Sequence, residues 1–229
     1  MTILHYFLGF PPYRSGGMTK FACDLMEAQV KDGENVIALW PGRMNFILPP
    51  KVKIKKRKNV NGIENYEIIN PLPIPLDEGI KNISMFVKEC NCNIYIKFLE
   101  ELKPDAIHIH TLMGIHKEFV DAAKKLRIKT VFTTHDYFGI CPKVILYKSS
   151  GVCDNDNNCK DCVKCNQSSL SVKKIKIMQS PLYRKFKNIK LIELLRKKHR
   201  NNFFDKGKQN FIEEGYKDDE SKEYEKLRK

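Results

Sequence analysis

The chain has 229 residues, 42% of them hydrophobic and 30% charged, so it can bury a core and we expect it to be soluble. No stretch approaches the roughly 20 apolar residues of a membrane helix, and residues 1–8 lack the basic lead-in of a signal peptide, so we expect a cytoplasmic protein with reduced cysteines. The net charge of +14 divides into +5 over residues 1–170, +10 over 171–200 and −1 over 201–229, which disfavours a function based on positive charge over the whole chain.

The first forty residues have the pattern of a strand, a loop, a helix and a second strand. Residues 2–8 form a nearly continuous apolar run, which is typical of a strand covered on both faces in a parallel sheet. A turn-rich loop comes next at 9–17, then apolar residues recur at helical steps from Met18 to Met26, and Gly33 is placed to end this helix. With a strand at 35–40, the segment predicts the building block of a doubly wound fold.

Strands and helices continue to alternate as far as residue 135. Three prolines within 71–75 exclude a helix there, and we expect an extended loop. The remaining predicted elements are strands at 65–69, 106–110 and 129–133 and helices at 84–102 and 116–126. The alternation predicts an α/β fold with a Rossmann-like, doubly wound parallel sheet.

The character of the sequence changes after residue 135. A cysteine-rich stretch at 141–165 is followed by a basic helical segment at 172–200 and by a polar stretch at 201–229 without an obvious core face. We therefore predict one domain over 1–200, with the cysteine-rich loop as an insertion, and a linker-like tail over 201–229.

The loop before the first helix ends in Gly16-Gly17, the first candidate for a binding site. Open α/β sheets bind ligands beyond the carboxyl ends of their strands, and glycines at a helix amino-terminus let backbone N–H groups approach an anion. The alternative is that the two glycines only make a tight turn. The spacing is not Gly-x-Gly-x-x-Gly, which disfavours a nicotinamide dinucleotide site and hence a dehydrogenase.

Histidines at strand ends form the second candidate. His108 and His110 are two residues apart on one predicted strand and so share a face, and His135-Asp136 closes the next strand. Such a histidine can donate to a hydroxyl or a phosphate oxygen. The alternative is a structural histidine with satisfied hydrogen bonds.

Five cysteines form the third candidate: Cys141, Cys153, Cys159, Cys162 and Cys165. The last three make two overlapping Cys-x-x-Cys pairs, and four thiolates at such spacing can close a tetrahedral zinc site that pins a loop without a core of its own. We expect a structural zinc ion, with the choice of four ligands among five left open. The alternatives are a redox-active or disulfide-linked loop and plain reduced thiols.

The basic segment 172–200 is the fourth candidate. Lysines interleaved with aliphatic and aromatic residues can lie on an anionic membrane, with the apolar side down. The same pattern fits an ordinary helix with its cationic face in water. Nucleic acid is disfavoured, because no recognised binding motif accompanies the charge.

Three motifs carry a resemblance to a known family. They are Pro-Asp-x-x-His-x-His at 104–110, Thr-x-His-Asp at 133–136, and His-Asp-Tyr-Phe-x-x-Cys-Pro at 135–142, which is followed by several cysteines. Together with the Gly-Gly loop, they make residues 2–165 resemble the amino-terminal half of family-four retaining glycosyltransferases with the GT-B architecture.

The resemblance implies a Rossmann-like domain that mainly binds the acceptor and faces a second such domain across a cleft. It implies that Gly16 and Gly17 lie near the nucleotide diphosphate and His135 near the transferred sugar. With His110 and Asp136 from the strand-end candidate, these are the expected substrate-binding residues. No residue of this chain is expected to be catalytic, since the second domain supplies the nucleotide pocket and the groups that steady the leaving diphosphate.

The chain departs from the family after residue 200. It has no Glu-x₇-Glu signature and no second strand–helix series, whereas a complete enzyme needs about 100–200 residues for each domain. We therefore expect an acceptor-side half that acts on a glycan or lipid-linked acceptor and is inactive without a donor domain, which a separate chain could supply with its nucleotide-sugar. The alternative is a non-catalytic, zinc-stapled module that binds an anionic membrane, at its inner face, or nucleic acid through 172–200.

Overall fold

The computed structural model describes most of the chain as two compact units. The described residues are 1–45, 51–75, 79–148, 151–154, 159–167, 169–186 and 218–227, with single residues between 189 and 197. The first unit comprises Met1–Pro73 and Val87–Asp136, and the second comprises Ile74–Phe86 and Tyr137–Lys229. The domain and tail boundaries at 200 stay predictions.

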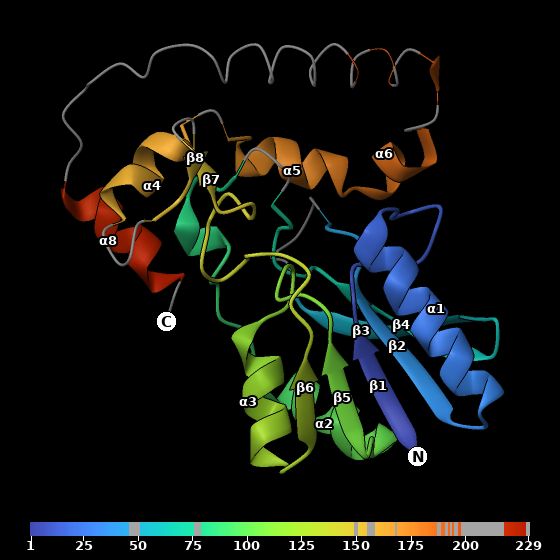
Figure 1. Cartoon of the computed structure of the whole chain (residues 1–229). Helices are drawn as coiled ribbons and strands as arrows, with labels where there is room; N and C mark the ends of the chain where they lie inside the picture. Colours follow the sequence, from blue (N-terminus) through green and yellow to red (C-terminus); the bar gives the residue numbers. More distant parts are fainter. Residues whose placement is uncertain are drawn as a thin grey trace. The chain divides into compact units, whose positions relative to one another are not determined.

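A six-stranded sheet forms the centre of the first unit (Figure 1). Its strands lie in the order β3-β4-β2-β1-β5-β6. Their bounds are β1 Thr2–Tyr6, β2 Asn35–Pro41, β3 Lys53–Val60, β4 Ile63–Ile69, β5 Ala106–Ile109 and β6 Lys129–Phe132. All neighbouring pairs are parallel except β3 with β4. The predicted Rossmann-like α/β fold is confirmed, with β1 at the crossover between the two halves of the sheet.

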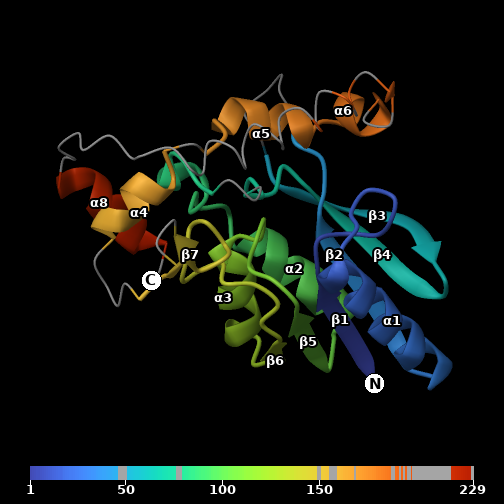
Figure 2. The ribbon, with the colours of Figure 1, turned by 45° about the horizontal axis from the view of Figure 1, so that its top comes forward.

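Helices cover both faces of this sheet (Figure 2). Helix α1, Gly17–Lys31, packs Ala22 and Met26 against Val36 and Ala38 of β2. Helices α2, Asn93–Leu102, and α3, Lys117–Lys125, cover the other face. Because neighbouring residues of a strand point to opposite faces, β2 serves both clusters at once.

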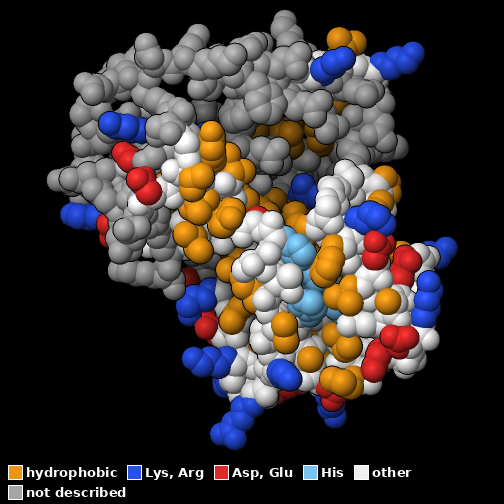
Figure 3. Space-filling model, in the orientation of Figure 1, with side chains coloured by type: hydrophobic (Ala, Val, Ile, Leu, Met, Phe, Trp, Pro, Cys, Tyr) orange, Lys and Arg blue, Asp and Glu red, His pale blue; other side chains and the backbone are white. Residues whose placement is uncertain are grey.

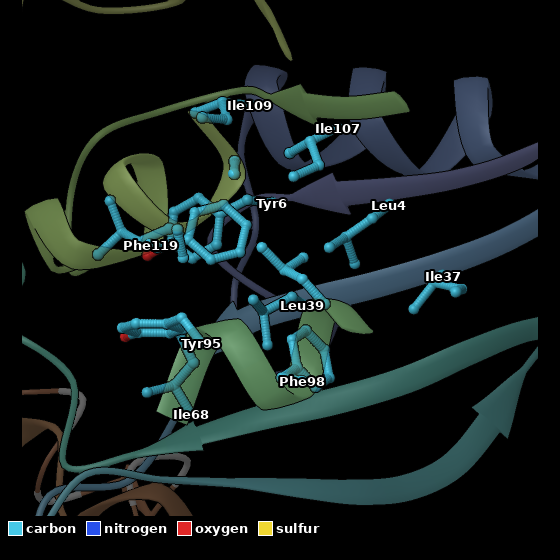
Figure 4. Close-up of a cluster of buried hydrophobic side chains, with 14 residues drawn as sticks. Leu4, Tyr6, Ile37, Leu39, Ile68, Tyr95, Phe98, Ile107, Ile109 and Phe119 are labelled. Carbon is cyan, nitrogen blue, oxygen red and sulfur yellow. The ribbon is translucent and has the colours of Figure 1, made fainter. Parts of the chain in front are cut away.

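The cluster under α2 and α3 holds the largest buried side chains. Figure 4 shows Tyr6 and Leu39 pointing from the sheet toward Tyr95 and Phe119 of the two helices. All four are fully buried, and each such side chain contributes about 1.5–3 kcal/mol of burial free energy. The Tyr6 hydroxyl donates to the Met113 carbonyl at 2.7 Å, so its one polar atom is satisfied.

The predicted helix at 84–102 is wrong in its first half. The structure has a short 3₁₀ helix, η1, at Ile83–Met85, and α2 begins only at Asn93. Ile83 and Phe86 are buried in the core of the second unit, whereas Tyr95 belongs to the core of the first. The chain passes from one unit to the other between these residues, so one continuous helix cannot serve both cores.

Strand β3 has no counterpart among the predicted elements. Its sequence, KIKKRKNV, is mostly basic and so gives little apolar signal. It forms one edge of the sheet, where lysines protect the open backbone groups from pairing with another chain. Arg57 of this strand binds the buried carboxylate of Glu67 on β4, with Nε at 2.7 Å from Oε2, which fixes the hairpin.

The second unit has its own small core. Its elements, besides η1, are β7 Tyr147–Lys148, β8 Gly151–Val152, α4 Lys160–Cys165, α5 Val172–Met178, α6 Pro181–Phe186 and α8 Asp218–Lys226. Tyr224 of α8 is buried, and its hydroxyl donates to the Ile80 carbonyl at 2.8 Å. Part of the segment predicted to be linker-like is thus a packed helix, whose Tyr224 lies in the core of the second unit with Leu227 packed against that core. Among the described residues, no helix combines the length and apolarity needed to span a bilayer.

Acid should destabilise the first unit through His116. This side chain is buried beside Tyr95, whose hydroxyl lies 2.8 Å from Nδ1, and burial lowers its pKa from 6.5 to about 4. The unfolded chain therefore takes up a proton at a pH where the folded chain does not, and stability is lost as the pH falls from 6.5 through 4. We expect this histidine to account for about 2–3 kcal/mol of the free energy of unfolding lost between pH 7 and pH 4. Urea titrations across this range should show a smaller acid loss for His116→Asn, and an unchanged pH profile would contradict the assignment.

Candidate functional site

The carboxyl ends of β1, β5 and β6 bring four histidines together. His5 lies opposite His108 in the register of β1 and β5, so both side chains leave the same face of the sheet. His110 follows β5 directly, and His135 comes three residues after β6. We call His5, His108, His110 and His135 the histidine cluster. The face drawn in Figure 3 shows histidine side chains at the surface among apolar ones.

A chain of hydrogen bonds links three of these rings to one glutamine. Gln29 Oε1 lies 2.7 Å from Nε2 of His5, and because a carbonyl oxygen only accepts, this nitrogen carries the proton. His5 Nδ1 then accepts from His110 Nε2 at 3.1 Å. His110 Nδ1 is left as an acceptor for His135 Nε2 at 3.4 Å. One amide oxygen thereby sets the hydrogen-bond direction from ring to ring along His5, His110 and His135.

His108 stacks against the ring of His110 but takes no part in this series of hydrogen bonds. Its ring centroid is 4.1 Å from that of His110 and 5.2 Å from that of His5. Its Nε2 lies 2.8 Å from the Thr133 hydroxyl, which directs the other ring nitrogen, Nδ1, away from this contact.

Burial keeps the inner rings neutral. Loss of solvation lowers the pKa of His5 to about 4 and that of His110 to about 3. The pKa of His108 is lowered as well, first by burial and then by the charge of His135. Since each positive charge in the cluster disfavours the next, the rings act near neutral pH as uncharged donors and acceptors.

The first turns of α1 lie beside the outer histidines. The Phe21 ring, which is half exposed, sits 5.0 Å from His135 and 6.0 Å from His110 between centroids. Gly16 caps this helix with φ 126°, a backbone conformation that favours glycine, and no side chain caps its amino-terminal N–H groups. A Cβ added at Gly17 would meet no atom within 4 Å, so the space above this amide is open.

The structure therefore gathers the predicted residues Gly16, Gly17, His110 and His135 around Phe21. Asp136 joins them through Thr111, whose hydroxyl donates to Oδ2 at 3.0 Å and accepts from the Met113 amide at 3.2 Å. That these residues bind a substrate stays a prediction.

Three residues of the site were missed from the sequence: His5, Gln29 and Phe21. His5 is a single histidine inside an apolar run, and Phe21 and Gln29 fit the pattern of an ordinary helix. One signal could have found His5. In a doubly wound sheet the first strand pairs with the strand after the crossover, which places His5 next to the predicted strand of His108.

The predicted cysteine site lies in the second unit. In the described part of the chain none of its five cysteines forms a disulfide bond, and Cys159 and Cys162 are buried in the core of that unit. Burial raises the pKa of the Cys165 thiol, and Cys153 and Cys141 lie close enough to raise it further. Within the described residues, the group whose ligand atoms all lie within 4.8 Å of one another is His5, His108 and His110. The zinc site on the cysteines stays a prediction.

Comparisons with known proteins add a distant structural likeness. No protein-family model and no curated protein matches this sequence. Among solved structures, the chain is similar to the catalytic domain of starch synthase IV from Arabidopsis thaliana bound to ADP and acarbose, with a TM-score of 0.36 and 16% sequence identity. The match covers 59% of this chain and 34% of that one, so the matched part is about a third of the solved chain.

The tautomers of the histidine cluster can be tested directly. We expect ¹⁵N NMR of the protein in EDTA to show a protonated Nε2 and a bare Nδ1 on both His5 and His110. Replacing Gln29 by leucine removes the carbonyl that holds the His5 proton, so mixed tautomers should appear in that variant, while His116 keeps its wild-type signals. A protonated Nδ1 on His5 in the wild type would contradict the hydrogen-bond series from Gln29 to His135.

Proposed function

We propose that this chain is the acceptor-side half of a sugar-nucleotide-dependent glycosyltransferase that builds a polysaccharide or glycolipid. The gathering of His110 and His135 around Phe21, in the first turns of α1, carries the proposal, because two imidazoles then lie beside a glycine-capped helix end. Backbone N–H groups at such an end suit a phosphate, and imidazoles suit sugar hydroxyls.

The order of the sequence motifs supports the same assignment. The Gly-Gly loop, the His-x-His strand and His135-Asp136 are the residues on which the family resemblance rests, and all of them line the carboxyl edge of one parallel sheet. Ligands of open α/β sheets bind at this edge, near the strand where the order reverses. In the proposed enzyme, Gly16 and Gly17 approach the diphosphate, and His135 contacts the transferred sugar.

The donor half is proposed to lie outside these 229 residues. Stabilising a departing diphosphate requires groups that are already in place, and the family signature for them is lacking in this sequence. We expect no sugar transfer by this chain alone. DNA beyond the codon for Lys229 should encode a second Rossmann-like domain with Glu-x₇-Glu, in the same or an adjacent frame.

Diphosphate binding tests the proposed site without requiring turnover. Titration with UDP, GDP and ADP, followed by ¹H–¹⁵N NMR, should shift the amides of Gly16, Gly17 and Phe21, with a Kd on the order of millimolar for this half alone. Gly17→Ala should abolish these shifts, because the new methyl group would occupy the open space that the diphosphate needs. The fold should be undisturbed, since a Cβ at this position meets no other atom within 4 Å.

Lys31→Ala provides the control, since Lys31 is exposed in the last turn of the same helix. This variant should bind like the wild type. Shifts confined to the second unit, or equal binding by Gly17→Ala, would count against a diphosphate site.

A second candidate function is favoured by the surface of α5 and α6. Ile177, Leu182 and Phe186 are 55%, 70% and 41% exposed, and exposed lysines 173 and 174 lie on the same segment. Exposed apolar residues next to a net charge of +10 over 171–200 are typical of peripheral contact with an anionic membrane. Nucleic acid would use the lysines but not the apolar side chains.

Binding to lipid vesicles distinguishes membrane contact from nucleic-acid binding. The protein should co-sediment with vesicles that contain phosphatidylglycerol and not with pure phosphatidylcholine, and salt should weaken the binding. Ile177→Asp with Leu182→Asp should reduce it about tenfold or more, because both apolar side chains then fail to enter the interface. Val152→Asp is the matched control, since Val152 is 71% exposed on β8. Unchanged binding by the double variant would exclude this mode of membrane contact.

A further inference from the structure

We propose that His5, His108 and His110 form a binding site for a divalent transition metal such as Zn²⁺. Each ring offers one nitrogen, and the three atoms lie within 4.8 Å of one another. The site is distinct from the cysteines of the second unit and does not depend on the proposed transferase function. Imidazole is a preferred ligand of zinc, and three protein nitrogens leave one position for water or an oxygen of a bound molecule.

The spacing of the nitrogens is close to that of a coordinated ion. Two nitrogens at 2.0–2.1 Å from a tetrahedral zinc ion lie about 3.4 Å apart. His5 Nδ1 and His110 Nε2 are 3.1 Å apart, so small ring rotations admit the ion between them and His108. His5 and His108 are carried by the neighbouring parallel strands β1 and β5, whose backbone register sets them opposite each other, and His110 follows β5 directly.

The outer contacts hold the rings in the orientation that coordination requires. Gln29 Oε1 accepts from His5 Nε2 at 2.7 Å, and the Thr133 hydroxyl contacts His108 Nε2 at 2.8 Å, so Nδ1 of both rings is left for the ion. Metal-binding histidines commonly donate their other ring nitrogen to an oxygen in this way, which fixes the tautomer.

Binding requires a proton shift but no proton loss. The proton on His110 Nε2, which bonds to His5 Nδ1, must leave the line between the two rings. It can be carried on His110 Nδ1 instead, where His135 Nε2 lies 3.4 Å away and becomes the acceptor. His135 then carries its own proton on Nδ1, so protons move between ring nitrogens and none is released.

A metal ion can reach the three histidines from solvent past His108, which is only partly buried. His5 and His110 are fully buried. An ion can therefore reach the cluster from solvent and lose most of its water shell on binding. Three neutral ligands leave its charge of +2 intact, which favours an anionic oxygen as the fourth ligand.

Titration with Co²⁺ and Zn²⁺ tests the site in the full chain. Cobalt on three imidazoles should give visible ligand-field bands without the near-ultraviolet charge-transfer band of a cobalt thiolate. His108→Asn, which removes the most accessible ligand, should weaken Co²⁺ binding more than about a hundredfold, and Gln29→Leu about 10- to 100-fold. His116→Asn is the matched control, because this buried histidine lies outside the cluster and should leave binding unchanged.

A second measurement needs no variant. Zn²⁺ should shift the ring ¹⁵N signals of His5, His108 and His110 in the wild type and leave those of His116 in place. Circular dichroism checks that each variant folds. The proposal is overturned if the folded wild type binds no cobalt, if thiolate bands account for all bound cobalt, or if His108→Asn binds as tightly as the wild type.

Discussion

The parallel pairing of β1 with β5 is the contact on which the rest of the first unit depends. It joins residues about 100 positions apart, since Ile3 pairs with Ala106 and Tyr6 with Ile109. On one face it aligns Leu4, Tyr6 and Ile107 for the core under α2 and α3. On the other face the same register sets His5 opposite His108, so a single pairing builds both the core and the histidine cluster. A slip of one residue would exchange the two faces and lose both.

The histidine cluster is possible only because its rings are uncharged. Two neighbouring imidazolium groups in a buried site would repel each other and lose their solvation, whereas neutral rings can donate and accept in a chain. Gln29 decides the direction of that chain, because its oxygen can only accept. At the proposed site a ligand therefore meets dipoles and lone pairs, and a group that changes the tautomer of one ring changes the hydrogen bonds of the next ring as well.

Much of this arrangement could be predicted from the sequence, because it obeys local rules. Apolar runs placed the strands, Gly33 marked the end of α1, and Gly16-Gly17 with the strand-end histidines located the site at the carboxyl edge. The misses have physical causes. Strand β3 is too basic to show an apolar pattern, and the expected helix at 84–102 spans a passage between two cores that no local periodicity reveals. His5 and Gln29 become site residues only through strand order and the face of α1, which are long-range properties.

The chemistry of the first unit also bears on why a separate donor half is proposed. Neutral imidazoles and the backbone N–H groups of one helix end offer partial charges, and a diphosphate that leaves with a full negative charge needs more compensation than such dipoles supply. The concentrated positive charge of the chain lies over 171–200, beyond the residues that make up the first unit. Exposed apolar side chains accompany it there, and they suit a lipid surface better than a nucleotide. In the proposed enzyme the two features divide the work: the sheet edge holds a polar, hydroxyl-rich ligand, and the basic segment brings the protein to an anionic surface that carries a lipid-linked acceptor.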